Sequence, residues 1–243
     1  EPIHGFHRMR FSTGFVAEGT LDHLLSALHI HHFNESLREL PDALVIHGAT
    51  IRTPVGTVLI VGDKGGGKTT LMLRLAMAGA EVVGDEHAFV IGDKIVTRPR
   101  TLRVKEGTLP HLPEDIAEKI RAQPHIRDWY GDPIYSVAPS LFQRDWIITP
   151  DRLRAIIVLS PNLGGRSRLR SVDKTQALPL LMRNASRPDG DRLKGFMALN
   201  TLCLKAPLLE LRNGNLADAE RLMHGVVTYP LRYWRASCGT KKR

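Results

Sequence analysis

Apolar residues recur at helical spacing in the first part of the chain. They follow Thr20, a residue that often caps a helix, and the pattern ends before Pro41. The residues that form the stripe are Leu21, Leu24, Leu25, Leu28, Phe33, Leu37 and Leu40. This spacing predicts a helical N-terminal segment, residues 1–42, packed on a core domain.

From residue 43 the pattern changes to short apolar runs rich in β-branched residues. ALVIH and TVLIVG, separated by RTPVG, predict two buried strands, and the second enters the glycine-rich stretch GDKGGGK. The residues from Lys68 to Ala78 carry an apolar stripe that predicts a helix ending at Gly79. AEVVGD predicts a strand ending at Asp85, and HAFVIGDKIVTRP predicts a hairpin that turns at Gly92.

The second half of the chain begins with a proline-rich stretch, residues 107–150, with one predicted helix at Glu114–Ala122. We expect a lid or a substrate-binding excursion there. LRAIIVLSP and APLLELRNG predict core strands, and helices are predicted at Thr175–Asn184, Asp191–Leu204 and Asn215–His224. The order of elements predicts an α/β fold, with residues 43–243 forming one phosphate-loop domain around a mixed central sheet.

The composition is that of an ordinary globular protein: 243 residues, of which 42% are hydrophobic and 24% are charged. We find neither a long apolar run nor the apolar core of a signal peptide, so we expect a soluble, cytoplasmic protein without a membrane partner. The two cysteines, Cys203 and Cys238, are far apart in the sequence and fit a reducing compartment.

The formal net charge of +9 would attract a nucleotide, an acidic peptide or RNA. Two basic clusters contribute much of it, one at residues 98–105 and one at residues 166–174. Neither cluster is interleaved with the aromatic residues that stack on single-stranded nucleic acid. A nucleic-acid partner is therefore disfavoured but stays open, and these clusters can also be ordinary solvated faces.

The glycine-rich stretch fits the phosphate-loop pattern G-x-x-x-x-G-K-[ST] between a predicted strand and a predicted helix. In such a loop consecutive backbone N–H groups turn inward around an anion, and the helix N-terminus adds its positive dipole end. We therefore expect an ATP site, with Lys68 reaching the outer phosphates and Thr69 offering its hydroxyl to Mg²⁺. The predicted ATP-binding residues are Gly62, Asp63, Lys64, Gly65, Gly66, Gly67, Lys68, Thr69 and Thr70.

Two carboxylates follow the loop closely, at the end of the strand EVVG. Beside a bound triphosphate, one carboxylate can take the proton of an attacking hydroxyl and the other can help hold Mg²⁺. We assign these roles to Asp85 and Glu86 respectively. The alternative is that Asp85 caps a turn and Glu86 is solvated.

Histidines near these elements are the remaining candidates. His47 ends the strand that precedes the strand of the loop, and its ring would face the site if the two strands were neighbours. The group His29, His31 and His32 has a spacing that does not bring three rings to one metal ion on a helix, so we do not expect a metal site there.

The stretch HGATIRTPVGTVLIVGDKGGGKTTLMLRLAMAGAEVVGDE resembles the core of the bacterial HPr kinase/phosphorylase family, phosphate-loop serine kinases related in fold to phosphoenolpyruvate carboxykinase. The clear part spans residues 44–88, and PLLELRNGNLADAERL resembles the closing strand and helix of these domains. The resemblance implies a serine kinase that uses ATP and Mg²⁺, with Asp85 as base and His47 nearby.

The chain departs from this family after the second acid. Members that act on HPr carry a Glu-hydrophobic-Arg-Gly segment there, whereas RPRTLRVKEGTLP has Glu106 as its only acid. HPr is therefore not the expected acceptor. The chain looks more like the HPr-kinase-like proteins of peptide natural-product pathways, including lasso-peptide tailoring kinases that phosphorylate a terminal serine.

We thus expect the acceptor to be a hydroxyl-bearing peptide, protein or small molecule. A nucleotide-dependent regulatory ATPase is the first alternative, and an RNA-directed kinase, motivated by the charge of +9, is the second. A homo-oligomer is possible in each case.

Overall fold

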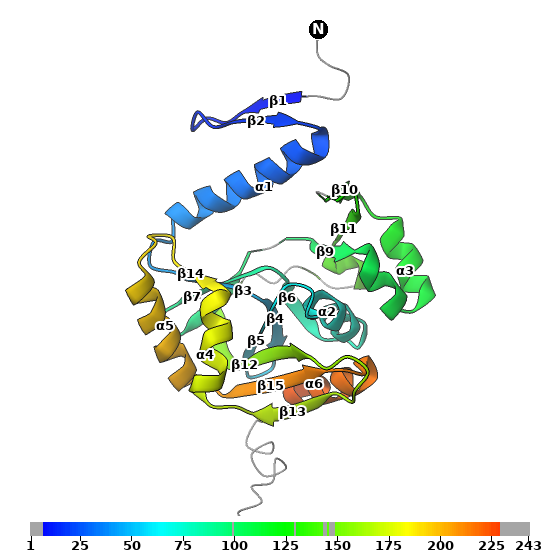
Figure 1. The fold of residues 1–243 in the computed structure, drawn as a ribbon, viewed down its shortest axis with the longest axis vertical. Coiled ribbons are helices and arrows are strands. Elements are labelled where there is room, and N and C mark those ends of the chain that lie inside the picture. Colours follow the sequence, from blue (N-terminus) through cyan, green and yellow to red (C-terminus); the bar gives the residue numbers. More distant parts are fainter. Residues whose placement is uncertain (1–6, 99, 129, 143–144, 146–148, 229–243) are drawn as a thin grey trace, which may run out of the picture.

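The structure is a computed structural model that describes residues 7–98, 100–128, 130–142, 145 and 149–228. It is an α/β fold with helices around a large mixed sheet (Figure 1). The helices are α1 (Leu21–Arg38), α2 (Lys68–Met77), α3 (Glu114–Arg121), α4 (Lys174–Arg183), α5 (Arg192–Lys205) and α6 (Leu216–Thr228), with 3-10 turns at Glu106–His111 and Pro139–Phe142. The strands are β1 (His7–Arg10), β2 (Val16–Gly19), β3 (Leu44–His47), β4 (Ala49–Thr53), β5 (Gly56–Gly62), β6 (Glu81–Gly84), β7 (His87–Ile91), β8 (Lys94–Thr97), β9 (Leu102–Lys105), β10 (His125–Arg127), β11 (Pro133–Val137), β12 (Asp151–Pro161), β13 (Arg168–Ser171), β14 (Ala185–Ser186) and β15 (Leu208–Asn213).

The longest strand, β12, joins the two halves of the main sheet. Its first residues pair antiparallel with β8, which leads through β7 and β3 to β14. Its later residues run parallel to β5 on one side and to β15 on the other. Beyond β5 lie β4 and then β6, both in antiparallel pairing, so β5 and β6 run in the same direction. Their carboxyl ends therefore meet at the same edge of the sheet.

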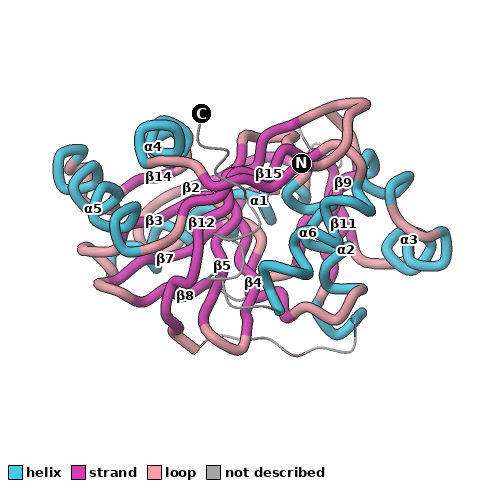
Figure 2. The backbone as a smooth tube through the Cα atoms, turned by 90° about the horizontal axis from the view of Figure 1, so that it is seen from below, coloured by secondary structure: helices cyan, strands magenta, loops and turns pink. Residues whose placement is uncertain are grey.

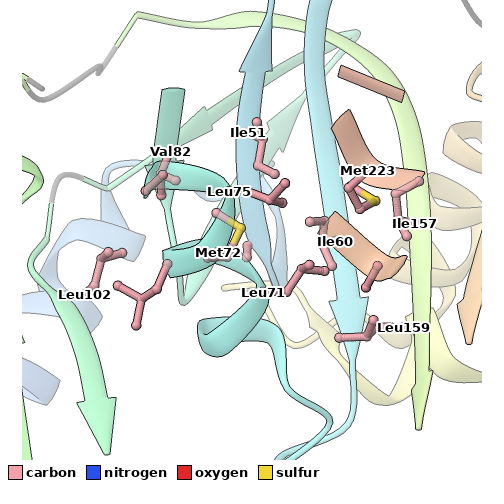
Figure 3. Close-up of a cluster of buried hydrophobic side chains, with 14 of the residues drawn as sticks. Ile51, Ile60, Leu71, Met72, Leu75, Val82, Leu102, Ile157, Leu159 and Met223 are labelled. Atoms are coloured by element: carbon pink, nitrogen blue, oxygen red, sulfur yellow. The ribbon is translucent and has the colours of Figure 1, made fainter. Parts of the chain in front are cut away.

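The main sheet separates two hydrophobic cores because successive side chains of a strand point to opposite faces. In β5, Val58 and Ile60 belong to one core, whereas Leu59 and Val61 belong to the other. Helices α2 and α6 cover the first face, and α4 and α5 cover the second (Figure 2). Figure 3 shows the first core, in which Leu71 and Leu75 of α2 lie against the sheet. Because β5 is buried on both faces, its sequence is continuously apolar.

The N-terminal segment contains the predicted helix, α1, and also a hairpin of β1 and β2 that the sequence did not indicate. The hairpin projects from the rest of the chain (Figure 1), whereas the first turn of α1 contacts β10, since Asp22 accepts a hydrogen bond of 3.1 Å from the N–H of Arg127. The later part of α1 is anchored because Phe33 and Leu37 pack on Val45 and Phe89 of the sheet. The placement of a domain boundary at residue 42 stays a prediction.

Much of the proline-rich stretch, predicted as an excursion, is regular structure that packs on the body of the protein. Strands β10, β11 and β9 form a three-stranded antiparallel sheet, with α3 beside it. Leu109, Ile120 and Val137 from this unit are buried in the same core as α2. The sequence missed β10 and β11 because the surrounding prolines indicated loops, and it missed β9 because this stretch forms part of a basic cluster.

The sequence left open whether β3 and β5 are neighbours, and they are not, because β4 pairs with β5 and β3 pairs with β7. The residues ATIRT form β4, although the last two of them had been assigned to the connecting stretch RTPVG. Most other predicted elements are present with boundaries shifted by one to three residues, and α6 extends to Thr228.

Cys203 is a free, buried cysteine, whereas Cys238 lies outside the described residues. No helix in the described part of the chain has the length and apolar character that crossing a membrane requires.

The buried position of Ile157, on β12 against α6, gives a test of the first core. We expect Ile157→Ala to lower the free energy of unfolding by about 2–5 kcal/mol, since it removes apolar contacts and leaves a cavity. Leu163→Ala is the control, because Leu163 is 94% exposed and its loss should change stability by less than about 0.5 kcal/mol. Equal midpoint shifts of the two variants in urea unfolding would contradict this packing.

Candidate active site

The predicted phosphate loop connects the end of β5 to the start of α2. Gly65 and Gly67 adopt left-handed conformations, with φ of 80° and 88°, which side chains other than glycine rarely adopt. Gly67 is the N-cap of α2 and provides no side-chain hydrogen bond, so the first N–H groups of the helix have no side-chain cap. A loop of this geometry can bind an anion through backbone N–H groups and the helix dipole.

The predicted ATP-binding residues all lie on this loop or on the first turn of α2. Gly62 ends β5, and Lys68, Thr69 and Thr70 begin the helix. Within the loop, Asp63 accepts through its backbone oxygen a hydrogen bond of 3.0 Å from the N–H of Gly66. The remaining loop residues are Lys64, Gly65 and Gly67.

Lys68 lies over the loop rather than in solvent. Its Nζ donates hydrogen bonds to the backbone oxygens of Gly62, at 2.7 Å, and of Asp63, at 3.2 Å. Burial lowers its pKa, and the charges of Asp85 and Asp63 oppose that change. The ammonium group is thus held within the loop, where it can exchange a carbonyl oxygen for a phosphate oxygen.

Asp85 follows β6 and reaches the start of α2. The hydroxyl of Thr69 donates to its Oδ2 at 3.0 Å, while its Oδ1 is buried and has no hydrogen-bond partner among the described residues. Burial raises the pKa of Asp85 to about 7, although the Thr69 hydrogen bond and the charges of Lys68 and Arg100 favour the ionised form. The residue keeps some exposed surface, so a bound molecule can reach it.

Magnesium prefers oxygen ligands and commonly uses one or two protein groups together with phosphates and water. The Thr69 hydroxyl, on the first turn of α2, is such a group, and the unpartnered Oδ1 of Asp85 is an acceptor that a hydroxyl of a bound molecule would satisfy. Groups of three or more His, Cys, Asp or Glu side chains placed to hold a metal are absent from the described residues.

Glu86, predicted as a second Mg²⁺ ligand, forms an ion pair with Arg100 through Oε2. To bind a metal, the Glu86 carboxylate would have to contact both Arg100 and the metal, or bind the metal through Oε1. Its role as a ligand stays a prediction. Sequence analysis did not single out Arg100 individually, because a contact between residues on two different elements leaves no local pattern.

His47 lies close to the loop although β3 and β5 are not neighbours. Burial lowers the pKa of His47, and the charge of Lys68 lowers it further. Its partner in the β3–β7 register is His87, with ring centroids 5.8 Å apart. Burial and the neighbouring His47 lower the pKa of His87 to about 4, so this ring is neutral near pH 7. The N–H of Gly48 donates to the oxygen of Glu86 at 3.1 Å and ties β3 to the acidic strand end.

Among the histidines of α1, His31 and His32 contact different groups. The ring of His31 packs on Phe11 and Phe15, and the Nδ1 of His32 lies 2.8 Å from a guanidinium nitrogen of Arg98.

Asn213, at the end of β15, was also missed by sequence analysis. A Cβ atom at Gly67 would come within 2.9 Å of its Nδ2, and its Oδ1 is buried without a partner among the described residues. The stretch ELRNG ends an apolar strand with a polar residue, and this was the available signal.

A cavity of about 260 Å³ opens beside Asp63, on the side of β5 opposite to β4 and β6. It lies between β12 and α4, and Asp63 there accepts a hydrogen bond of 3.4 Å from Arg183. Its lining mixes apolar side chains with Ser160 and Glu210, as small-molecule pockets commonly do. The loop thus has Asp85 on one side and a cavity on the other.

Comparison with protein-family models and with curated proteins finds no match. Among solved structures, the Hpr(Ser) kinase/phosphatase from Coxiella burnetii is similar over 79% of this chain and 97% of its own, at 14% sequence identity and a TM-score of 0.36. A similarity of this degree establishes neither activity nor substrate for this chain.

The raised pKa of Asp85 predicts a pH-dependent cost to stability. Between the ordinary pKa of 3.8 and about 7, the folded protein binds a proton that the unfolded chain has lost, so stability falls as pH rises. Asp85→Asn should remove this fall, which amounts to about 1.4 kcal/mol for each unit of difference in pKa. Urea unfolding at pH 5 and pH 8 measures it.

Asp93→Asn, at an exposed hairpin turn, is the matched control for the loss of one carboxylate. If the free energy of unfolding changed equally between pH 5 and pH 8 in Asp85→Asn and in the wild type, the Asp85 carboxylate would not be desolvated in the folded protein.

Proposed function

We propose that this protein is an ATP-dependent kinase, a phosphotransferase that transfers the γ-phosphate to a serine-type hydroxyl of a peptide, protein or small molecule. The observation that supports the proposal most directly is the hydrogen bond from Thr69 to Asp85, since it fixes a desolvated carboxylate at the helix start that would bind phosphate. The sequence resemblance of residues 44–88 to serine kinases agrees with it.

In this proposal residues 62–70 bind the triphosphate through backbone N–H groups, and Lys68 moves from the loop carbonyls to the outer phosphates. The nucleoside would occupy the cavity beside Asp63. Thr69 and Glu86 would hold Mg²⁺, which leaves the carboxylate of Asp85 for the acceptor hydroxyl. The metal, when bound, neutralises charge that develops on the transferred group.

Asp85 would take the proton of the acceptor hydroxyl. The hydroxyl oxygen forms a bond to the γ-phosphorus, the bond from that phosphorus to the bridging oxygen breaks, and ADP leaves with the electron pair. A general base works best when its pKa lies near the working pH, and burial brings Asp85 to about 7. His47, held near Lys68, would accept a hydrogen bond from the reacting groups or donate one to them.

Substitutions of Asp85 and of Lys68 distinguish ATP binding from phosphoryl transfer. We expect Asp85→Asn to keep ATP affinity within roughly tenfold while transfer falls by roughly 10²–10⁴, the usual contribution of a general base. Lys68→Met should weaken ATP binding itself, since it removes the loop's ammonium group. Radiolabelled ATP with Mg²⁺, a lysate of the source organism and serine-containing peptides measure transfer, and calorimetry measures binding.

Asp93→Asn and Lys94→Met make the same chemical changes at exposed hairpin positions and should behave as the wild type. Full transfer by Asp85→Asn would remove the assigned base. ATP binding with release of free phosphate alone would favour a regulatory ATPase, and labelling of RNA in place of peptide would favour the RNA-directed kinase.

A further inference from the structure

Basic side chains from α1, from the connection between β8 and β9, and from β9 itself lie together beside the candidate active site. We call this group the basic patch and define it as Arg98, Arg100, Arg103, His29 and His32. Burial lowers the pKa of His29 most, and the charges of the three arginines and of His32 lower it further. All five groups are therefore close enough to interact electrostatically. The Nδ1 of His32 lies 2.8 Å from Arg98, so the patch spans both elements.

Two of the three arginines of the patch, Arg98 and Arg103, carry charge that no ion pair balances among the described residues. Within the described ranges no carboxylate forms an ion pair with Arg98 or Arg103. The carboxylate whose charge acts on Arg103 is Asp128, which already accepts hydrogen bonds from Lys105, at 3.0 Å, and from two backbone N–H groups. Both arginines are nevertheless half-buried, and such guanidinium groups are normally paired with an anion.

The patch continues directly into the site. Arg100 forms an ion pair with Glu86, the neighbour of Asp85, and its charge acts on Asp85 itself. Arg98 and Arg103, which have no ion-pair partner among the described residues, flank Arg100 in the sequence, so an acidic segment bound to them would extend towards the site.

We propose that the basic patch binds acidic side chains that flank the acceptor hydroxyl, so that the preferred acceptor is an acidic polypeptide. The guanidinium groups of Arg98 and Arg103 would form charge-assisted hydrogen bonds with its carboxylates. The role of the hydroxyl rests on the proposed kinase function, but binding of the acidic segment does not.

The contacts of the patch favour a polypeptide over single-stranded RNA. RNA bases would need an exposed aromatic face on which to stack. Phe33, whose ring centroid lies 6.0 Å from the guanidinium of Arg98, already packs on His87, with centroids 4.1 Å apart. Around Arg98 a partner therefore meets charge rather than a free aromatic face, whereas Tyr130, near Asp128, is exposed.

The test uses a fluorescein-labelled peptide in which serine is flanked on each side by two glutamates, and a matched peptide with glutamines. Fluorescence anisotropy without nucleotide should show binding of the glutamate peptide at least roughly tenfold tighter, as expected for charge-assisted hydrogen bonds. Arg98→Gln combined with Arg103→Gln should remove this preference. Arg166→Gln combined with Arg168→Gln, an equal change of charge at exposed positions near and on β13, should keep it.

Several results would overturn the proposal: equal affinity for the two peptides, no binding of either, or equal weakening by both double variants. Tight binding of a labelled oligouridine through Arg98 and Arg103, with no preference for the glutamate peptide, would replace it with an RNA surface. Phosphoryl transfer to serine peptides regardless of their charge would contradict the binding role of the basic patch and support the kinase function. A preserved preference for the glutamate peptide without any phosphoryl transfer would support the binding role and contradict the kinase function.

Discussion

The arrangement of the candidate site depends on one buried carboxylate, that of Asp85, held by the hydroxyl of Thr69 at the first turn of α2. Removal of a carboxylate from water is costly, and one of its oxygens has no partner in the described part of the chain. Only Lys68, Thr69 and Arg100 oppose the cost, and they do not compensate for it. Carboxylates whose pKa is strongly shifted by burial are enriched at functional sites, which agrees with the role that we propose for Asp85.

The sheet supplies the framework that makes this contact possible. β4 runs antiparallel to both β5 and β6, so the loop after β5 and the acids after β6 leave the sheet at the same edge. β3 crosses into β4 at Gly48, where a Cβ atom would come within 2.7 Å of the backbone oxygen of Ile60. This close approach brings His47 towards the loop although its own strand lies in the other half of the sheet.

The sequence predicted the parts of the site that local pattern determines. The continuous apolar run of β5, the glycines after it and the stripe of α2 specify strand, loop and helix without reference to the rest of the chain. Asp85 comes directly after the apolar strand EVVG, so the local pattern also predicted a carboxylate at that strand end. By contrast, the pairing of His47 with His87 and of Glu86 with Arg100 arises from strand order, which local periodicity does not contain. Strands β10 and β11 were missed because prolines such as Pro124 and Pro133 indicated loops, and β9 because its charged residues hid the apolar alternation of Leu102 and Val104.

The proposed role of Asp85 as a base depends on the pKa of its carboxyl group in the folded protein without nucleotide. A titration of its side-chain carboxyl carbon by NMR, with assignment from Asp85→Asn, measures this directly. We expect a midpoint of about 7, because burial outweighs the neighbouring hydroxyl and cations. A midpoint near the ordinary value of 3.8 would show a solvated carboxylate, and would contradict its role as a base tuned by burial.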